Sequence, residues 1–365
     1  MSLQCGIVGL PNVGKSTLFN CLSNAQALAA NYPFATIEPN VGVVNVPDER
    51  LFTLEKLVKP QRVVPTTVEI VDIAGLVAGA SKGEGLGNQF LSNIRNTDAI
   101  VHVIRCFDDN NVVHVNGKID PVSDKEIIDL ELQLKDIESV EKKINKLEKQ
   151  LKAGDKEAKY GVEILQIYLN HLSSGKSART APVEPDEQRF IQDINLLTAK
   201  PVLYVCNVDE AGAVNGNAYT KALQDAVAAE NAEVLIICAA LEADIAQLDT
   251  YEERLMFLND VGLQEPSISK LIKSSYKLLD LITYFTAGEK EVRAWTITKG
   301  TKAPQAAGVI HSDFERGFIR AEVIAFDDFV HYGSESAARA AGKLNVEGKE
   351  YVVKDGDIMH FRFNV

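Results

Sequence analysis

The residues with the most recognisable chemistry stand near the start of the chain, where residues 9–17 read GLPNVGKST directly after the apolar run 5–8. This spacing of two glycines, a lysine and a hydroxyl residue is typical of a loop whose backbone N–H groups surround nucleotide phosphates. Gly9 and Gly14 keep side chains out of the loop, Lys15 neutralises the outer phosphates and the Ser16 hydroxyl holds Mg²⁺. The pattern predicts a nucleoside triphosphate site with Lys15 as a catalytic residue.

Two further motifs supply other groups that a triphosphate site needs. The first is DIAG at residues 72–75, where Asp72 would reach Mg²⁺ and the Gly75 N–H would bond the γ-phosphate. The second contains Thr36, in a segment broken by two prolines, where a threonine completes the Mg²⁺ shell while the γ-phosphate is bound. We therefore expect Ser16, Thr36 and Asp72 to hold Mg²⁺. The glycine-rich residues 76–87 are either a mobile switch or a flexible surface loop.

The residues that would select the base follow another apolar run as Asn207-Val208-Asp209-Glu210. A guanine-specific site has Asn-Lys-x-Asp here, because one carboxylate accepts both N1–H and the 2-amino group of guanine, whereas adenine N1 is an acceptor. Val208 replaces the lysine and Glu210 the aspartate. We therefore expect ATP to be preferred over GTP, with Asn207, Val208 and Glu210 in the nucleotide site. The alternatives are a shifted register, in which Asp209 reads guanine, and a GTP-specific site.

The position directly after the DIAG motif, where many GTPases place a glutamine that orients the attacking water, holds Leu76. A leucine cannot hydrogen-bond water, so intrinsic hydrolysis should be slow unless another group takes this role. Histidine changes charge near physiological pH, and His114 lies in the polar residues 110–117. We therefore predict His114 as a second catalytic residue, which positions water or transfers a proton. The alternative is an ordinary histidine of a surface loop.

These motifs need a scaffold that brings their loops together, and the pattern before residue 280 indicates a parallel sheet with crossover helices. Short apolar runs alternate with helical stretches, and several are apolar throughout, as in strands covered on both faces. Ligands of such sheets bind at the carboxyl ends of the strands, where each motif lies. We expect an α/β phosphate-loop nucleotidase domain with strands at 5–8, 41–46, 68–72, 99–105, 202–207 and 234–238.

A helical insertion is expected between the fourth and fifth of these strands. Apolar residues repeat there at spacings of three and four, from Ile137 to Leu151 and from Ala158 to Leu172, with a turn at 153–155. This pattern is typical of an antiparallel coiled coil. Lysines near its tip indicate contact with an RNA phosphate backbone or, alternatively, a solvated helix face. They are Lys142, Lys143, Lys146, Lys149, Lys152, Lys156 and Lys159.

The pattern changes near residue 281, where short strands, glycine turns and one helix near 336–341 indicate a compact α+β domain. The expected strands are 292–298, 319–325, 351–353 and 358–363, with residues 300–308 as a loop. The predicted domains are therefore 1–123 and 199–280 for the nucleotide site, 124–198 for the coiled coil and 281–365 for the C-terminal domain.

Composition is typical of an intracellular protein. The 365 residues carry a net charge of −13, which argues against a generally basic nucleic-acid binder. No apolar stretch nears the roughly 20 residues that span a bilayer. The five cysteines are dispersed and odd in number, so they suggest neither a disulfide framework nor a zinc site. We expect a cytoplasmic monomer without membrane contact.

In combination, the motifs resemble those of the Obg-like ATPases of the YchF group. The likeness covers nearly the whole chain and includes GLPNVGKST, YPFATIEPN at 32–40, DIAGLV at 72–77, NVDE at 207–210 and DGDIMHFRF at 355–363. The resemblance implies an ATP-preferring member of the translation-factor class of GTPase folds. It also implies a C-terminal β-grasp (TGS) domain and association with the ribosome, through ribosomal or transfer RNA.

The resemblance also assigns roles to single residues. It implies that Ser16 and Thr36 hold Mg²⁺, that Val208 touches the adenine, and that the phosphates are bound by Asn12, Val13, Gly14, Lys15, Ser16 and Thr17. By likeness to cation-activated relatives, Asn12 would hold K⁺ against the phosphates in place of an arginine finger. Two alternatives stay open, a phosphate-loop kinase and an RNA-binding module that is stabilised by ATP but does not turn it over.

Overall fold

The computed structural model describes residues 3–28, 41–73, 86–109, 111–112, 114, 117–151, 154–248 and 250–364. The chain groups into two compact units. Among the described residues, the first unit contains 3–24, 41–42 and those of 69–268, and the second contains 25–28, 43–68 and 269–364. No described helix has both the length and the apolar character that a membrane span requires.

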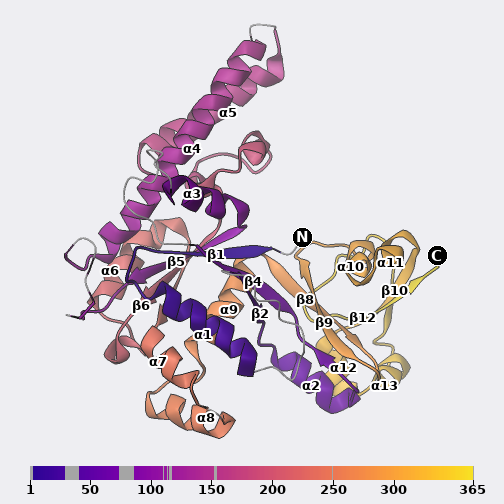
Figure 1. The fold of residues 1–365 in the computed structure, drawn as a ribbon. Coiled ribbons are helices and arrows are strands. Elements are labelled where there is room, and N and C mark those ends of the chain that lie inside the picture. The colour runs from indigo at the N-terminus through magenta and orange to yellow at the C-terminus, as the bar shows by residue number, and fades with distance from the viewer. Residues whose placement is uncertain are drawn as a thin grey trace. The chain divides into compact units, whose positions relative to one another are not determined.

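A six-stranded sheet forms the centre of the first unit, in the order β2-β4-β1-β5-β6-β7 (Figure 1). β1 pairs in parallel with β4 and β5, and β6 with β5 and β7, so the carboxyl ends of these strands share one edge. β5 and β6 are buried along their whole length. The predicted α/β class and strands are thus confirmed, with β1 (Gln4–Val8), β2 (Val41–Asn45), β4 (Thr67–Asp72), β5 (Ala99–Arg105), β6 (Val202–Asn207) and β7 (Glu233–Ile237).

Two long helices, α4 and α5, form the predicted helical hairpin and extend from the sheet as an arm (Figure 1). Val140, Ile144, Leu165 and Leu172 are buried between them, at positions of the predicted apolar repeat, whereas Leu151 is exposed at the tip. The helices of the unit are α1 (Lys15–Leu28), α3 (Leu86–Asn96), α4 (Pro121–Leu151), α5 (Lys156–Ser173), α6 (Ala218–Val227), α7 (Ala239–Ile245) and α8 (Tyr251–Asp260), and α9 (Ser267–Leu278) leads to the second unit.

A buried carboxylate ties the arm to the chain that returns from it. The Asp136 side chain is fully buried and accepts hydrogen bonds from the Leu197 N–H at 2.7 Å, the Thr198 N–H at 2.8 Å and the Thr198 hydroxyl at 2.7 Å. Three donors satisfy the charge that burial would otherwise penalise. The base of the arm is therefore a rigid part of the first unit.

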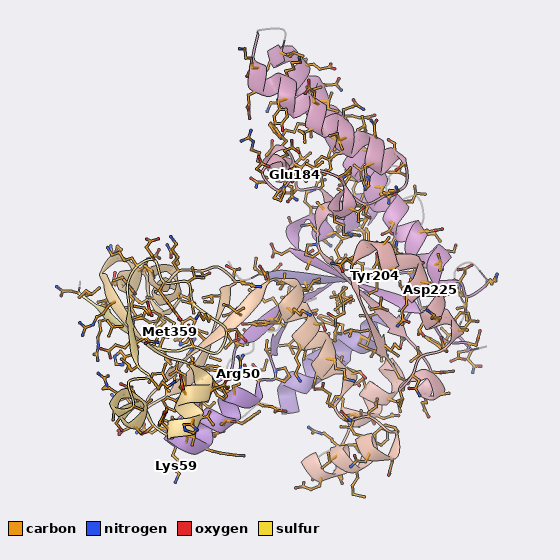
Figure 2. All side chains as sticks on the ribbon, turned by 180° about the vertical axis from the view of Figure 1, so that it is seen from behind. Arg50, Lys59, Glu184, Tyr204, Asp225 and Met359 are labelled. Carbon is orange, nitrogen blue, oxygen red and sulfur yellow. The ribbon has the colours of Figure 1, made fainter. Side chains whose placement is uncertain are left out.

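Polar side chains also join the foot of α4 to the sheet. Lys125 pairs with Asp129 at 2.5 Å and with Glu230 at 2.7 Å, and the Tyr204 hydroxyl donates to Glu230 at 2.8 Å. Tyr204 is labelled in Figure 2. Burial, with Lys125 and a neighbouring arginine, lowers the pKa of His102 to about 3, so this side chain is neutral in the fold. The contact between the foot of α4 and the sheet is thus a cluster of charged and hydrogen-bonded side chains rather than an apolar core.

The second unit has a mixed six-stranded sheet in the order β11-β10-β12-β8-β9-β3. Separate apolar cores lie on it, one around Tyr284, Met359 and Phe361 and one around Leu54 and Phe285; Figure 2 labels Met359. The predicted α+β character is confirmed. The elements are β3 (Val63–Val64), β8 (Leu281–Ala287), β9 (Val292–Thr298), β10 (Phe318–Ile324), β11 (Asn345–Glu347), β12 (Ile358–Phe363), α2 (Glu49–Val58), α10 (Ala303–Ile310), α11 (Ser312–Arg316), α12 (Phe326–Tyr332) and α13 (Glu335–Ala340).

The second unit contains a segment that the sequence pattern placed in the nucleotide-binding domain. Residues 43–68 group with the C-terminal part of the chain. Within this unit β3 pairs in parallel with β9, and Arg50 on α2 pairs with Asp355 at 2.8 Å. These contacts join positions more than two hundred residues apart, which a local pattern cannot reveal. The predicted boundaries at 123, 198 and 280 stay a prediction.

Two local expectations in the second unit were wrong. Residues 303–310 of the predicted 300–308 loop form α10, because Pro304 lies in the first helical turn, where it needs no hydrogen-bond donor, and alanines follow it. The predicted strand at 351–353 is only an isolated bridge between Lys302 and Val352. The expectation about the cysteines agrees with the fold, since all five are buried and none forms a disulfide.

Candidate nucleotide-binding site

The predicted phosphate loop connects the end of β1 to the start of α1. Asn12 (φ 63°) and Gly14 (φ 92°) take left-handed backbone conformations, and the Leu18 N–H donates to the Gly14 carbonyl at 3.0 Å in the first turn of the helix. A side chain at Gly9 would place its Cβ 2.6 Å from the Val103 carbonyl, and one at Gly14 would collide with the Asn207 amide. The two glycines are therefore required by close approach of the neighbouring strands.

Lys15, the first residue of α1, forms an ion pair with Asp72 at the end of β4. The ends of β1 and β4 are adjacent because the two strands pair in parallel, with Ile7 opposite Asp72. Both charged side chains are largely buried. The structure thus brings together the predicted phosphate-binding lysine and the predicted metal-binding carboxylate.

A cavity of about 1030 Å³ lies at this edge of the sheet, which is large enough for a nucleotide. It contains most of the predicted site residues, while the buried Val13 contributes its backbone to the loop. Its lining residues are Leu10, Pro11, Asn12, Gly14, Lys15, Ser16, Thr17, Asp72, Phe107, Asp108, Asp109, Val112, Asn207, Val208, Asp209, Glu210, Ala211, Ala239 and Ala240. Two predicted site residues, Thr36 and Gly75, lie outside the described residues.

Asn207 joins three loops of the cavity. Its amide donates to the Val13 carbonyl at 2.9 Å and its carbonyl oxygen accepts from the Ala239 N–H at 3.0 Å. The side chain is buried. It therefore holds the phosphate loop, the end of β6 and the start of α7 in one arrangement.

The three residues after Asn207 have different environments. Val208 is buried, and its N–H donates to the Ile237 carbonyl at 2.9 Å. Asp209 caps the short turn that follows, accepting from the Gly212 N–H at 3.0 Å. Glu210 is exposed along the cavity. The carboxylate in the shifted-register alternative thus caps a turn through one oxygen, while Asp209 and Glu210 are both exposed and both line the cavity.

His114 lies in a different environment from the one expected. Its Nε2 is 2.8 Å from the Asp124 carboxylate, and the two side chains are only 7% and 1% exposed. Asp124 belongs to the first turn of α4. His114 is therefore a buried partner of the arm helix rather than a surface histidine, and it is not among the described residues that line the cavity. Its catalytic role stays a prediction.

Several residues of the site escaped the sequence analysis. Phe107, Asp108 and Asp109 line the cavity after β5, and Tyr219 on α6 donates to Asp108 at 3.1 Å. Arg105, at the end of β5, is buried and bonds this loop. The only available signal was their place directly after a predicted strand, at the edge where ligands bind.

The lysines of the arm differ in their availability. Lys143 pairs with Asp193 and donates to the Phe190 carbonyl at 2.6 Å, and Lys142 pairs with Glu138. Lys142 is nevertheless exposed, as are the lysines nearer the tip, namely Lys146, Lys149, Lys156 and Lys159. Lys152 lies outside the described residues. Part of the predicted basic surface is therefore structural and part faces solvent.

The parallel sheet and the phosphate loop at its edge define a P-loop nucleotide hydrolase of the GTPase class. A family model described as 50S ribosome-binding GTPase matches residues 4–159, and the YchF C-terminal model, described as a protein of unknown function, matches residues 281–364.

Close relatives cover the whole chain. The proteins named Ribosome-binding ATPase YchF of Haemophilus influenzae and Bacillus subtilis are each 55% identical over 365 and 367 residues, which is 100% of both chains. The solved structure of the Schizosaccharomyces pombe YchF GTPase is 41% identical, with a TM-score of 0.89 over 99% of this chain and 98% of that one. The chain belongs to the YchF family.

Proposed function

We propose that this protein is a ribosome-associated ATPase that prefers ATP to GTP. The observation that carries the base preference is the purine end of the cavity, where the buried Val208 stands in place of a lysine and Asp209 caps a turn. No basic side chain at position 208 clamps a guanine, and the carboxylate at Glu210 is longer than the usual aspartate. The names of the relatives support hydrolysis of ATP, although the fission yeast relative is named a GTPase.

The phosphate end fits a magnesium nucleotide. Ser16 and Asp72 offer a hydroxyl and a carboxylate on the cavity wall, which are hard oxygen ligands of the kind Mg²⁺ takes. The described residues form no cluster of three or more carboxylate, histidine or cysteine side chains. Bound Mg²⁺ would neutralise phosphate charge. We assign Thr36 to the same ion and the Gly75 N–H to the γ-phosphate from the sequence.

Lys15 would move from its partner to the phosphates when a nucleotide binds. Its ammonium is paired with Asp72, and a triphosphate carries more negative charge than one carboxylate. The same binding would free Asp72 to face Mg²⁺. Lys15 would then stabilise the charge that develops on the phosphoryl oxygens during hydrolysis.

His114 and Asn12 are the candidates for the remaining catalytic roles. His114 is not among the described residues that line the cavity, so we expect hydrolysis to require movement that brings its ring to the attacking water. Asn12 lines the cavity next to the phosphates and would hold K⁺ there. Phosphate release measured in matched K⁺ and Na⁺ buffers tests the second role, and equal rates would remove it.

Exposed lysines at the tip of the arm are the proposed ribosome contact. The Lys146→Glu, Lys149→Glu and Lys156→Glu triple variant reverses three exposed charges and should weaken ribosome co-sedimentation with a reduced dependence on salt. The Lys221→Glu variant is the control, because Lys221 is an exposed lysine on α6. Equal co-sedimentation of both variants would contradict the arm as the contact.

Restoring the guanine motif tests the base preference. In the Val208→Lys and Glu210→Asp double variant, the ratio of ADP to GDP affinity should fall at least tenfold, because a lysine clamp and a short carboxylate favour guanine. The Glu233→Asp variant shortens an exposed carboxylate at the start of β7 and serves as the control. A ratio unchanged from wild type in a folded double variant would show that these positions do not select the base.

A further inference from the structure

Arg105, the last residue of β5, is a cation enclosed by the first unit. Its relative exposure is 1%. Among the fully buried side chains that the structure describes, it is the largest by volume. Removing a charged group from water costs free energy, so a charge is buried only where several hydrogen bonds compensate the lost hydration. Its contacts therefore indicate a specific role.

All the hydrogen bonds shown for this guanidinium go to one short loop. Nε donates to the Phe107 carbonyl at 3.1 Å, Nη1 to the Val112 carbonyl at 2.8 Å and Nη2 to the Asp109 carbonyl at 3.2 Å. The guanidinium carbon also lies 4.5 Å from the centre of the Phe107 ring, as a cation–π contact. One side chain thus sets the backbone direction at three positions between 107 and 112.

The loop is part of the cavity wall, beside the base-reading residues. Phe107, Asp108, Asp109 and Val112 line the cavity together with Val208 to Ala211. The two segments are adjacent because β5 and β6 pair in parallel and the Cys106 N–H donates to the Asn207 carbonyl at 2.7 Å. Because Phe107, Asp108, Asp109 and Val112 share the cavity wall with the proposed base-reading residues, the purine would lie beside them.

The direction of the carbonyls explains what the guanidinium does. Three carbonyl oxygens point at Arg105, so the side chains of the loop are left to form the wall. Without the cation these three carbonyls would lose their shared donor and would turn toward solvent, because the residues that carry them are exposed or half-buried. The loop would then have to turn over and carry the Phe107 ring with it.

We propose that Arg105 is a positioning residue for the purine base, holding the backbone at Phe107, Asp109 and Val112 so that the Phe107 ring forms a flat apolar wall of the pocket. Arg105 acts through the loop, and we assign it no contact with the phosphates. The inference rests on the proposed nucleotide site for the location of the base. It does not depend on which purine the site prefers.

Isothermal titration of the full-length protein with ADP and, separately, with inorganic tripolyphosphate tests this role. Arg105→Met should weaken ADP at least tenfold and tripolyphosphate less than twofold, and Arg105→Lys should restore part of the ADP affinity. The matched control is Arg179→Met, because Arg179 is also largely buried in the first unit and donates to the Thr198 and Lys200 carbonyls at 3.2 and 3.1 Å. This control should leave both ligands within twofold of wild type.

The outcomes separate the possible failures. An equal loss of both ligands in Arg105→Met would indicate a general disturbance of the site and overturn the proposal, as would unchanged ADP affinity. If Arg105→Met does not fold, the two affinities are compared in Arg105→Lys instead, because a lysine keeps the charge but cannot serve three diverging carbonyls as a planar guanidinium does. This variant should weaken ADP more than tripolyphosphate, and an equal loss of both ligands or an unchanged ADP affinity would overturn the proposal. Tighter GDP than ADP binding by the wild type would contradict the proposed ATP preference and leave the role of Arg105 intact.

Discussion

Asn207 offers a quantitative test of how the site is assembled. Replacing it with alanine removes the bonds to the Val13 carbonyl and the Ala239 N–H, at 2.9 and 3.0 Å, in a position that is 4% exposed. One buried acceptor and one buried donor would lose their partner, at about 1–3 kcal/mol each, so we expect a loss of about 3 kcal/mol. For a unit of this size, that corresponds to a fall in Tm of about 6–12 °C.

Urea unfolding of the Asn207→Ala variant, followed by circular dichroism, measures this loss. Asn207→Asp should behave differently, because it keeps an acceptor for the Ala239 N–H but puts a carboxylate against the Val13 carbonyl. Both variants disturb the phosphate loop at Val13, and we expect Asn207→Asp to weaken the binding of nucleotide phosphates at least as much as Asn207→Ala does. Asn170→Ala is the control, because Asn170 is exposed on α5 and its side chain accepts a hydrogen bond from Gln166 on the same helix. A free energy of unfolding within 0.5 kcal/mol of wild type for Asn207→Ala, roughly the scatter of surface substitutions, would refute the reasoning.

Two further predictions concern the base of the arm. Asp136→Ala should cost about 3 kcal/mol in urea unfolding, because it leaves the three buried donors of Leu197 and Thr198 without their acceptor; a loss below 1 kcal/mol would contradict this. His102 has a pKa of about 3 in the fold, so below pH 6.5 the unfolded chain binds a proton that the fold does not. The free energy of unfolding therefore falls by up to about 1.4 kcal/mol per pH unit as pH drops from 6.5 toward 3. His102→Gln should remove this contribution to the pH dependence of stability. A pH dependence equal to that of wild type would refute the prediction.

Much of the first unit could be predicted from the sequence because its signals are local. The apolar runs became the strands of the sheet, and the spacing of Ile137 to Leu151 predicted the arm. The phosphate loop followed from glycine and lysine spacing alone. Each of these patterns depends on neighbouring residues along the chain, so it can be recognised from the sequence without a structure.

The remaining features depend on contacts between distant residues. Asn207 was predicted to bind nucleotide, but no local pattern reveals that its amide also bonds Val13, 194 residues earlier. His114 was predicted to be catalytic, with a surface-loop histidine as the alternative, and its burial against Asp124 is a contact that the local pattern does not reveal. Arg105 was read only as the end of a strand. Residues 300–308 were misread because glycines at both ends hid a helix that begins at Ala303, with Pro304 in its first turn.

The base preference of the cavity, adenine over guanine, can be measured directly. Isothermal titration of one nucleotide-free preparation with ADP and with GDP, each with Mg²⁺, tests it most directly. The arrangement of Val208, Asp209 and Glu210 predicts at least tenfold tighter binding of ADP. Equal affinities, or tighter binding of GDP, would contradict the account.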